Sequence, residues 1–207
     1  MKYKIVIQVI LGIVAIGLSY WIYEGIMKPE RFKTEVSKRN DAIIEKLKDI
    51  RTIQIAYKGV YARYCSSFDT LAIFLEKGKL PLVKKEGNVP DTLTEAQALK
   101  MGLVKRDTVY VSAYESLFGS QGKKIDIQKL RYIPFSQNKE FEMKASSVNK
   151  GNIQVPVFEI LAPYDSYIND MDEQLVRNLN VKAKDMDRYA GIKLGSLDEP
   201  STDGNWE

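Results

Sequence analysis

Histidine is absent from the 207-residue chain, and cysteine occurs once, as Cys65. Without histidine there is no imidazole base, no Ser-His or Cys-His nucleophile pair and no ligand for most zinc sites. A single cysteine excludes an intrachain disulfide and any Cys-x-x-Cys site. The net charge is only +4 at pH 7, whereas a nucleic-acid binder normally carries a strong basic patch. These absences favour a non-enzymatic protein that holds no cofactor and no metal and binds no nucleic acid.

Charge is absent from residues 5–23, which read IVIQVILGIVAIGLSYWIY. As a helix this run would extend roughly 28 Å, close to the ~30 Å hydrocarbon core of a bilayer. Amphipathic aromatic rings favour the membrane interface, and three of them stand at the far end of the run: Tyr20, Trp21 and Tyr23. We therefore expect residues 1–27 to be a transmembrane anchor in contact with the lipid bilayer.

Two alternatives concern the fate and orientation of this anchor. Ala15 and Gly17 offer an A-x-G cleavage site, but the apolar run continues past them, which favours retention over cleavage. Only four residues precede the span, so the simplest topology has the N-terminus in the cytoplasm. The basic residues beyond the span weaken the positive-inside contrast: Lys28, Arg31, Lys33, Lys38 and Arg39. We expect a single-pass protein of the bacterial inner membrane with a periplasmic C-terminal domain.

Small side chains lie on one face of the expected membrane helix, at Gly12, Ala15 and Ser19. Small residues at this spacing let a second membrane helix approach closely. The alternative is that they reflect the Gly and Ala content common to membrane helices. The first interpretation predicts helix packing within the membrane.

Residues 28–64 are expected to form a helical stalk, in which Pro29 suits the first turn of a restarted or bent helix. Two sets of residues alternate at spacings of three and four and fill the a and d positions of a heptad pattern. The residues are Val36, Asn40, Ile43, Leu47, Ile50, Gln54, Tyr57 and Tyr61. This seam predicts a coiled coil with another chain. The alternative is a single amphipathic helix whose lower half stands free and whose upper half packs on the domain.

Residues 65–197 are expected to form a small α+β domain with a largely antiparallel sheet. Capping and stop signals predict short helices near 69–76 and 92–101. A shared apolar face predicts a further helix at 166–179, formed by Ile168, Met171, Leu175 and Leu179. Alternating β-branched and aromatic residues predict strands near 108–114, 130–135, 140–145, 153–161 and 192–197. The acidic tail, residues 198–207, is expected to be flexible.

The sequence contains only weak matches to known catalytic and metal-binding motifs. The run from Gly119 to Lys124 lacks the spacing of a phosphate-binding loop. The acidic residues from Asp165 to Glu173 lack the twelve-residue calcium-loop arrangement. Cys65 is expected to be a buried apolar residue rather than a reactive thiol. The sequence therefore predicts no catalytic, cofactor-binding or metal-binding residue.

This layout of a short tail, one span, a helical stalk and a small α+β domain resembles the alignment-subcomplex proteins of type IV pilus and type II secretion machines. The resemblance covers the whole chain and is architectural. It implies a structural subunit whose periplasmic domain pairs with others and links parts of an envelope complex. Its partners would be other membrane or periplasmic subunits, or a second copy of itself.

Two further resemblances rest on short passages. Residues 51–64, followed by SFDTL at 67–71 and GKLP at 78–81, resemble the helix and following passage of pilins and pseudopilins. That likeness implies a filament subunit, although the first glutamate after Gly17 is Glu24, too far along for the family's processing site. The closing residues 191–199 and 204–207 resemble the tails of unassigned membrane proteins of Bacteroidota. A membrane-tethered enzyme or ligand sensor is a third alternative.

Overall fold

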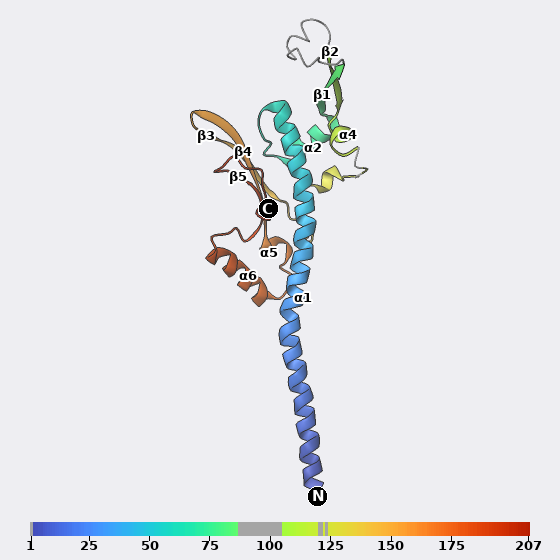
Figure 1. Ribbon diagram of the computed structural model, residues 1–207, viewed down its shortest axis with the longest axis vertical. Coiled ribbons are helices and arrows are strands. Elements are labelled where there is room, and N and C mark those ends of the chain that lie inside the picture. Colours follow the sequence, from blue (N-terminus) through green and yellow to red (C-terminus); the bar gives the residue numbers. More distant parts are fainter. Residues whose placement is uncertain (1, 87–104, 120–121, 123) are drawn as a thin grey trace, which may run out of the picture. The chain divides into compact units, whose positions relative to one another are not determined.

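The computed structural model describes residues 2–86, 105–119, 122 and 124–207 of the chain. A long helix is followed by short helices and strands that come mostly in pairs, and both strand pairs with an assigned register are antiparallel (Figure 1). This arrangement confirms the expected α+β class. In chain order the elements are α1 (Lys2–Tyr61), α2 (Phe68–Lys77), β1 (Lys79–Glu86), β2 (Lys105–Ser112), α4 (Ala113–Phe118), η2 (Ile127–Lys129), β3 (Glu142–Lys150), β4 (Ile153–Pro163), α5 (Tyr164–Tyr167), α6 (Glu173–Asp185) and β5 (Gly191–Ser196).

The chain divides into two compact units. Unit 1 contains residues 1–45, 133–139 and 162–192, and unit 2 contains residues 46–132, 140–161 and 193–207. Helix α1 contributes to both units, so this division cuts across the expected stalk and domain. Each unit therefore contains its own part of α1.

Helix α1 is continuous from Lys2 to Tyr61 and includes Pro29 in its interior. Proline has no N–H to donate four residues back, so the carbonyl of Gly25 lacks this intrahelical bond. The helix ends at Ala62, whose positive φ of 56° is the left-handed conformation that commonly stops a helix. The N–H of Ala62 bonds the carbonyl of Lys58 at 2.8 Å and closes the last turn.

The core of unit 2 forms around the second part of α1. Its buried side chains include Leu47, Ile50, Ile53 and Tyr57, which recur at the three- and four-residue spacing of one helix face. The ring of Tyr57 meets that of Phe74 from α2 edge-on, with 5.2 Å between ring centroids. The apolar face of the helix is thus covered within its own unit.

Two antiparallel hairpins belong to unit 2. Strand β1 pairs with β2, and β3 pairs with β4 in a sheet whose order is β3-β4-β5. Gly151 and Asn152 join β3 to β4 with φ values of 59° and 67°, as a two-residue type I′ turn requires. Strands predicted near 108–114, 140–145, 153–161 and 192–197 are confirmed in the main. The predicted helix at 92–101 lies outside the described residues.

The predicted strand at 130–135 is wrong. Only one isolated antiparallel bridge, between Tyr132 and Glu140, occurs in this stretch. Phe135 has a positive φ of 63°, which ends an extended conformation, and the preceding Pro134 cannot donate to a ladder. Alternating apolar residues here belong to turns: the side chains of Leu130 and Ile133 are both buried.

The acidic tail is not flexible as expected, because it returns alongside β5. The N–H of Gly195 donates to Asp203 O at 2.8 Å, and the N–H of Asn205 donates to Lys193 O at 2.9 Å. The last residue, Glu207, forms an ion pair with Arg51 of α1 at 2.8 Å. Backbone pairing overrides the polar composition that suggested disorder.

Gly195 is a point where the fold requires glycine. Its φ is +73°, and an added Cβ would lie 2.3 Å from the carbonyl oxygen of Phe158. We expect Gly195→Ala to destabilise the protein by roughly 3 kcal/mol, because it combines left-handed strain with a backbone clash. Gly151→Ala is the control, since φ is +59° but an added Cβ would meet nothing within 4 Å. Equal thermal unfolding midpoints of the two variants in detergent would contradict this expectation.

Unit 1 packs α5 and α6 with the first part of α1. The predicted helix at 166–179 is in fact two helices separated by a turn. The carboxylate of Asp172 accepts the N–H of Leu175 at 3.0 Å and begins α6 as an N-cap. The side chains of Tyr167 and Ile168 before this turn are fully buried.

Candidate membrane anchor

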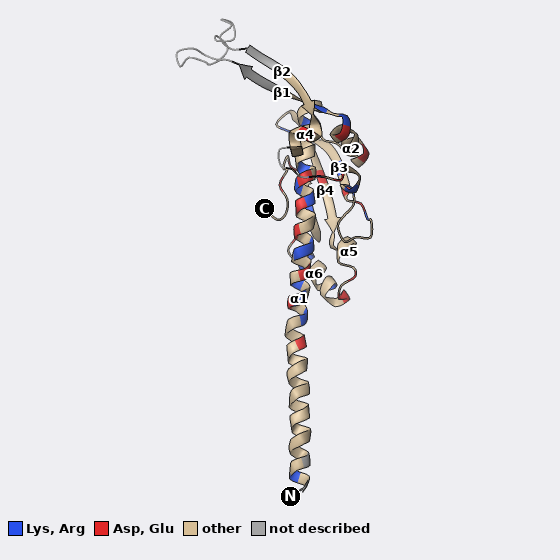
Figure 2. Ribbon diagram, turned by 90° about the vertical axis from the view of Figure 1, so that its right-hand side faces the viewer, with Lys and Arg blue, Asp and Glu red and all other residues tan. Residues whose placement is uncertain are grey.

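The N-terminal apolar run of α1, residues 5–23, carries side chains that nothing in the described structure covers. An 18-residue window of the helix has a mean hydropathy of 2.3, and 0% of it is buried. Figure 2 shows this part of α1 without charged residues except at its N-terminal end. The helix is therefore long and apolar enough to cross a membrane, and its apolar window is not buried.

The predicted packing face lies on this exposed part. Ser19 Oγ donates to the carbonyl of Ala15 at 2.9 Å, so the hydroxyl is satisfied within its own helix. A Cβ added at Gly12 would meet nothing within 4 Å. The face formed by Gly12, Ala15 and Ser19 is thus open to close approach, and a second helix upon it stays a prediction.

The predicted interface residues stand at the end of the uncharged run, just before charge returns on the helix. Tyr20, Trp21 and Tyr23 are exposed by 67%, 75% and 52%. One residue later Glu24 begins the charged part of the helix, and it forms an ion pair with Arg31 at 3.6 Å. This order of aromatic and then charged side chains is typical of a membrane boundary.

An ion pair ties α6 to α1 close to this boundary. Lys28 Nζ lies 2.7 Å from the carboxylate of Asp172, the residue that also caps α6. The hydrogen bond with Lys28 lowers the pKa of the Asp172 carboxyl, and the same bond raises the pKa of Lys28. Lys28 lies five residues beyond Tyr23, or about 8 Å along a helix. The start of α6 is therefore held within one to two helical turns of the boundary.

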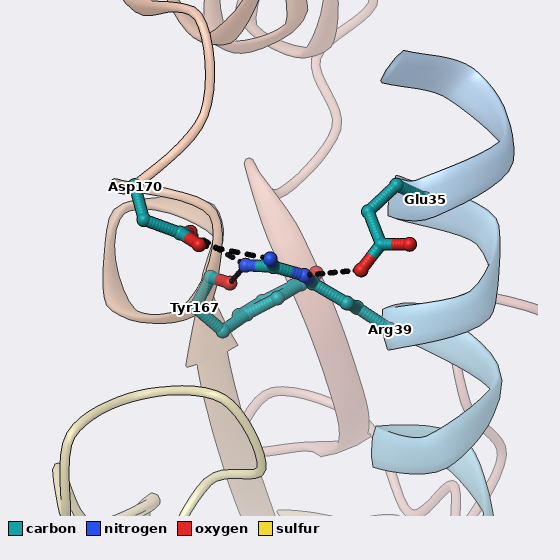
Figure 3. Close-up of polar contacts among 4 residues, drawn as sticks. All are labelled: Glu35, Arg39, Tyr167 and Asp170. Atoms are coloured by element: carbon teal, nitrogen blue, oxygen red, sulfur yellow. Dashed lines mark hydrogen bonds and ion pairs between the residues drawn. The ribbon is translucent and has the colours of Figure 1, made fainter. Parts of the chain in front are cut away.

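Arg39 forms the most extensive polar contact of unit 1 (Figure 3). Its Nη1 donates to the carbonyl of Tyr167 at 2.6 Å, and its two terminal nitrogens reach the Asp170 carboxylate at 2.5 and 2.9 Å. Its Nε donates to Glu35 at 3.1 Å on the same helix. The guanidinium also lies over the ring of Phe135, 5.3 Å from the centroid. Arg39 therefore fastens α1 to the turn between α5 and α6.

The burial of Arg39 makes this contact more specific than an ordinary surface pair. Its side chain is only 11% exposed, and a guanidinium matches a carboxylate through two parallel hydrogen bonds. The hydrogen bond with Arg39 holds the pKa of the Asp170 carboxyl below its usual value. Nothing in the sequence distinguishes Arg39 from its charged neighbours, because Tyr167 and Asp170 lie far away in the chain.

Acid should weaken this contact in a defined pH window. The depressed pKa of Asp170 contributes stability above the unfolded value of about 3.9, and this contribution is lost below it. We expect Asp170→Asn to lower the unfolding midpoint by about 2–4 °C at pH 7 and at pH 5, and less near pH 3. Asp198→Asn, at an exposed position, is the control. A difference between Asp170→Asn and wild type that is unchanged near pH 3 would contradict this assignment.

The predicted stalk seam divides between the two units. In unit 1, Val36 and Ile43 are buried, and Asn40 Oδ1 accepts the hydroxyl of the buried Tyr167 at 2.7 Å. In unit 2 the seam continues as Leu47, Ile50, Gln54 and Tyr57, which are buried, and Tyr61, which is exposed.

The buried seam side chains favour the alternative in which the helix packs within its own chain. The lower half does not stand free as that alternative expected, because Val36 and Ile43 are buried in unit 1. A coiled coil through the same side chains would require this core to open. Pairing of two copies through the seam therefore stays a prediction that the burial does not support.

Gln54 is the polar seam residue whose role differs most from the expectation. Its Nε2 donates to Cys65 O at 2.7 Å, and its Oε1 accepts Cys65 N–H at 2.9 Å. The side chain is fully buried, with Met143 Sδ at 3.1 Å from the amide nitrogen. Gln54 thus pairs with both backbone groups of Cys65, as a residue of a neighbouring β-strand would, and holds the turn after α1.

The candidate residues for catalysis or metal binding make structural contacts or lie partly outside the described residues. No group of three or more His, Cys, Asp or Glu residues able to hold a metal occurs in the described part of the chain. The predicted acidic run is used structurally: Asp165 accepts an amide hydrogen bond from Asn180 at 2.9 Å, and Asp170 and Asp172 make the contacts above. Cys65 is buried, and its Sγ lies 3.2 Å from Ser67 O. The loop from Gly119 to Lys124 lies partly outside the described residues.

Comparison of the chain with protein-family models, curated proteins and solved structures found no match. Among the features of the chain itself, the exposed apolar run of α1 has the clearest physical consequence.

Proposed function

We propose that the chain is a membrane-anchored, non-enzymatic structural subunit of a bacterial envelope complex. The main support for this proposal is a contrast within α1. The described apolar side chains of the run at residues 5–23 are exposed, whereas Ile43, Leu47 and Ile50 further along the helix are buried. Burying a large apolar side chain is worth about 1.5–3 kcal/mol. An apolar run of this length left in water is unfavourable, and a bilayer removes that cost.

We place the N-terminus in the cytoplasm and the two units in the periplasm, with the span in the inner membrane. Lys2 and Lys4 before the span support this orientation, whereas Lys28, Arg31 and Lys33 beyond the span reduce the charge contrast. Residues 1–45 of α1 belong to unit 1, so the anchor and the part of unit 1 that packs on α1 share one helix. Lys28 and Arg39 reinforce this coupling in unit 1.

The proposed role is to hold other subunits rather than to transform a substrate. The open face at Gly12, Ala15 and Ser19 fits a second membrane helix, from another subunit or from a second copy. Contacts of this kind would hold the protein at a defined place in an assembly spanning the envelope, whether for secretion, pilus formation or motility.

Membrane extraction tests the anchor directly. We expect the full chain, expressed in a bacterium with a C-terminal epitope, to stay in the membrane pellet after alkaline carbonate and to require detergent for release. A chain lacking residues 2–27 should be released without detergent. In spheroplasts, protease should remove the epitope of the full chain. Release of the full chain by carbonate, or an epitope protected from protease, would contradict the proposal.

A pilin-like filament subunit is the second candidate. It is favoured by the continuity of α1 from Lys2 to Tyr61, which joins an exposed apolar part to a part that packs in a domain with antiparallel strands. The N-terminal sequence of the mature protein separates the candidates. A start at residue 1 or 2 supports the permanent anchor, whereas cleavage near Gly17 supports the filament subunit.

A further inference from the structure

A polar groove opens in unit 2 between the hairpin of β3 and β4 and the turn that follows α1. Its volume is about 610 Å³, within the range of ligand-binding pockets. Arg63, Ser66 and Ser67 line it on the side of the turn. Ala145, Ser146 and Ser147 line it on the side of β3. Among the described lining residues there is one guanidinium and no carboxylate.

Strand β3 is a free edge of its sheet in the described part of the chain. The sheet order is β3-β4-β5, and the outer side of β5 is already occupied by the tail through Gly195 and Asn205. No described strand pairs with the outer side of β3. An unpaired edge presents a row of backbone donors and acceptors that an extended chain can use.

The hairpin turn shows which residues of β3 offer these groups. In a two-residue type I′ turn the flanking residues, here Lys150 and Ile153, form a hydrogen-bonded pair. Hydrogen-bonded and non-hydrogen-bonded pairs alternate along an antiparallel ladder. The backbone N–H and C=O groups of Ala145 and Ser147 therefore point away from β4. Both residues line the groove.

Arg63 supplies a positive charge that the described residues do not neutralise. It is exposed, and no described residue makes an ion pair or hydrogen bond with it. Arg39, Arg51 and Arg131 each have carboxylate partners. A groove with a guanidinium that no described residue pairs, several hydroxyl groups and a strand edge is complementary to an extended segment that carries a carboxylate.

We propose that the edge of β3 takes up an extended acidic segment of a partner protein as an added strand, with a carboxylate of that segment at Arg63. This inference goes beyond the anchoring role and does not depend on it. The backbone of β3 would supply affinity, and Arg63 would supply the preference for acidic side chains. A small anion would use Arg63 but not the edge, and a second copy of the chain is the other competing occupant.

Peptide binding to the full chain in detergent micelles tests the proposal. The probe is a fluorescent peptide mixture of about eight residues in which Glu alternates with Val, Thr or Ile, a length typical of one strand. Mixtures with Gln or Lys in place of Glu measure the charge preference. We expect the Glu mixture to bind at least about tenfold more tightly than the Lys mixture, and added salt to weaken its binding.

Three variants separate the edge from the charge. Arg63→Gln should weaken binding of the Glu mixture about tenfold, because one charge-assisted contact is lost. Ser147→Pro removes an outward N–H, which an edge strand tolerates, and should weaken binding of both the Glu and the Gln mixtures. Arg188→Gln, at an exposed position outside the groove, should change nothing. Far-ultraviolet circular dichroism verifies that each variant is folded.

Each other result would overturn the proposal. Absence of binding by the Glu mixture at about 1 mM, which corresponds to a binding free energy of only about −4 kcal/mol, means that the edge takes up no such segment. Displacement by sodium phosphate together with unchanged binding to Ser147→Pro indicates an anion site without an added strand. Self-association that is lost in Arg63→Gln, without peptide binding, assigns the edge to a second copy instead.

Discussion

Two arginines in the middle of the apolar part of α1, Ile10→Arg with Ile13→Arg, are expected to move the chain from the membrane fraction to the soluble or degraded fraction. Each replacement exchanges an apolar side chain for a charge near the bilayer centre. On insertion scales each exchange costs about 3–4 kcal/mol, and the pair about 6–8 kcal/mol. Both positions lie in the part of the helix that is wholly exposed. Carbonate extraction followed by immunoblotting measures the effect.

The matched control keeps the positions and removes the charge. Ile10→Leu with Ile13→Leu should stay in the membrane pellet, since leucine is as favourable in lipid as isoleucine. Retention of the double-arginine chain in the pellet would mean that the domain, not the span, holds the protein at the membrane. The anchoring proposal would then fail even if the span is apolar enough to insert.

The apolar part of α1 could be predicted because its signal is local. Length, absence of charge and terminal aromatic rings all lie within residues 5–23, and no distant contact is needed to interpret them. The α+β class was predictable for a related reason, since helix caps and strand alternation are also local patterns. The structure adds that the same helix continues without a break past Pro29.

Errors arose where distant residues decide the structure. The tail reads as polar and acidic, but its backbone pairs with β5 and Glu207 reaches Arg51. Arg39 reads as one more surface charge, but its partners lie on the turn after α5. At 130–135 the residues alternate as a strand would, yet Phe135 adopts a left-handed conformation and ends the pattern. Such contacts between residues far apart in the chain produce no periodic pattern in the sequence.

The stalk seam shows the limit of a heptad argument. Alternating spacings of three and four identify a face that is buried, and most of these side chains are indeed buried. The pattern does not say whether another helix or the chain's own domain covers the face. In a coiled coil, the polar residues Asn40 and Gln54 of this seam would set the register of the two helices. In the structure they instead bond Tyr167 and Cys65 of the same chain.

Gln54→Leu should therefore be strongly destabilising, although leucine suits both a helix and an apolar core. The replacement leaves the N–H and C=O of Cys65 buried without the partners that they have at 2.9 and 2.7 Å. An unsatisfied buried backbone group costs about 1–3 kcal/mol, so we expect a loss of roughly 3 kcal/mol for the pair. For a chain of this size that lowers the unfolding midpoint by about 6–12 °C.

Thermal unfolding of the full chain in detergent, followed by circular dichroism, measures this loss. Gln128→Leu makes the same chemical change at an exposed position and should shift the midpoint by less than about 2 °C. The two interpretations of Gln54 predict opposite signs. If Gln54 served to set register between two helices, leucine at this core position would raise the stability of the paired form and make the midpoint depend more strongly on protein concentration. A lower midpoint that is independent of concentration is expected if Gln54 holds the turn at Cys65.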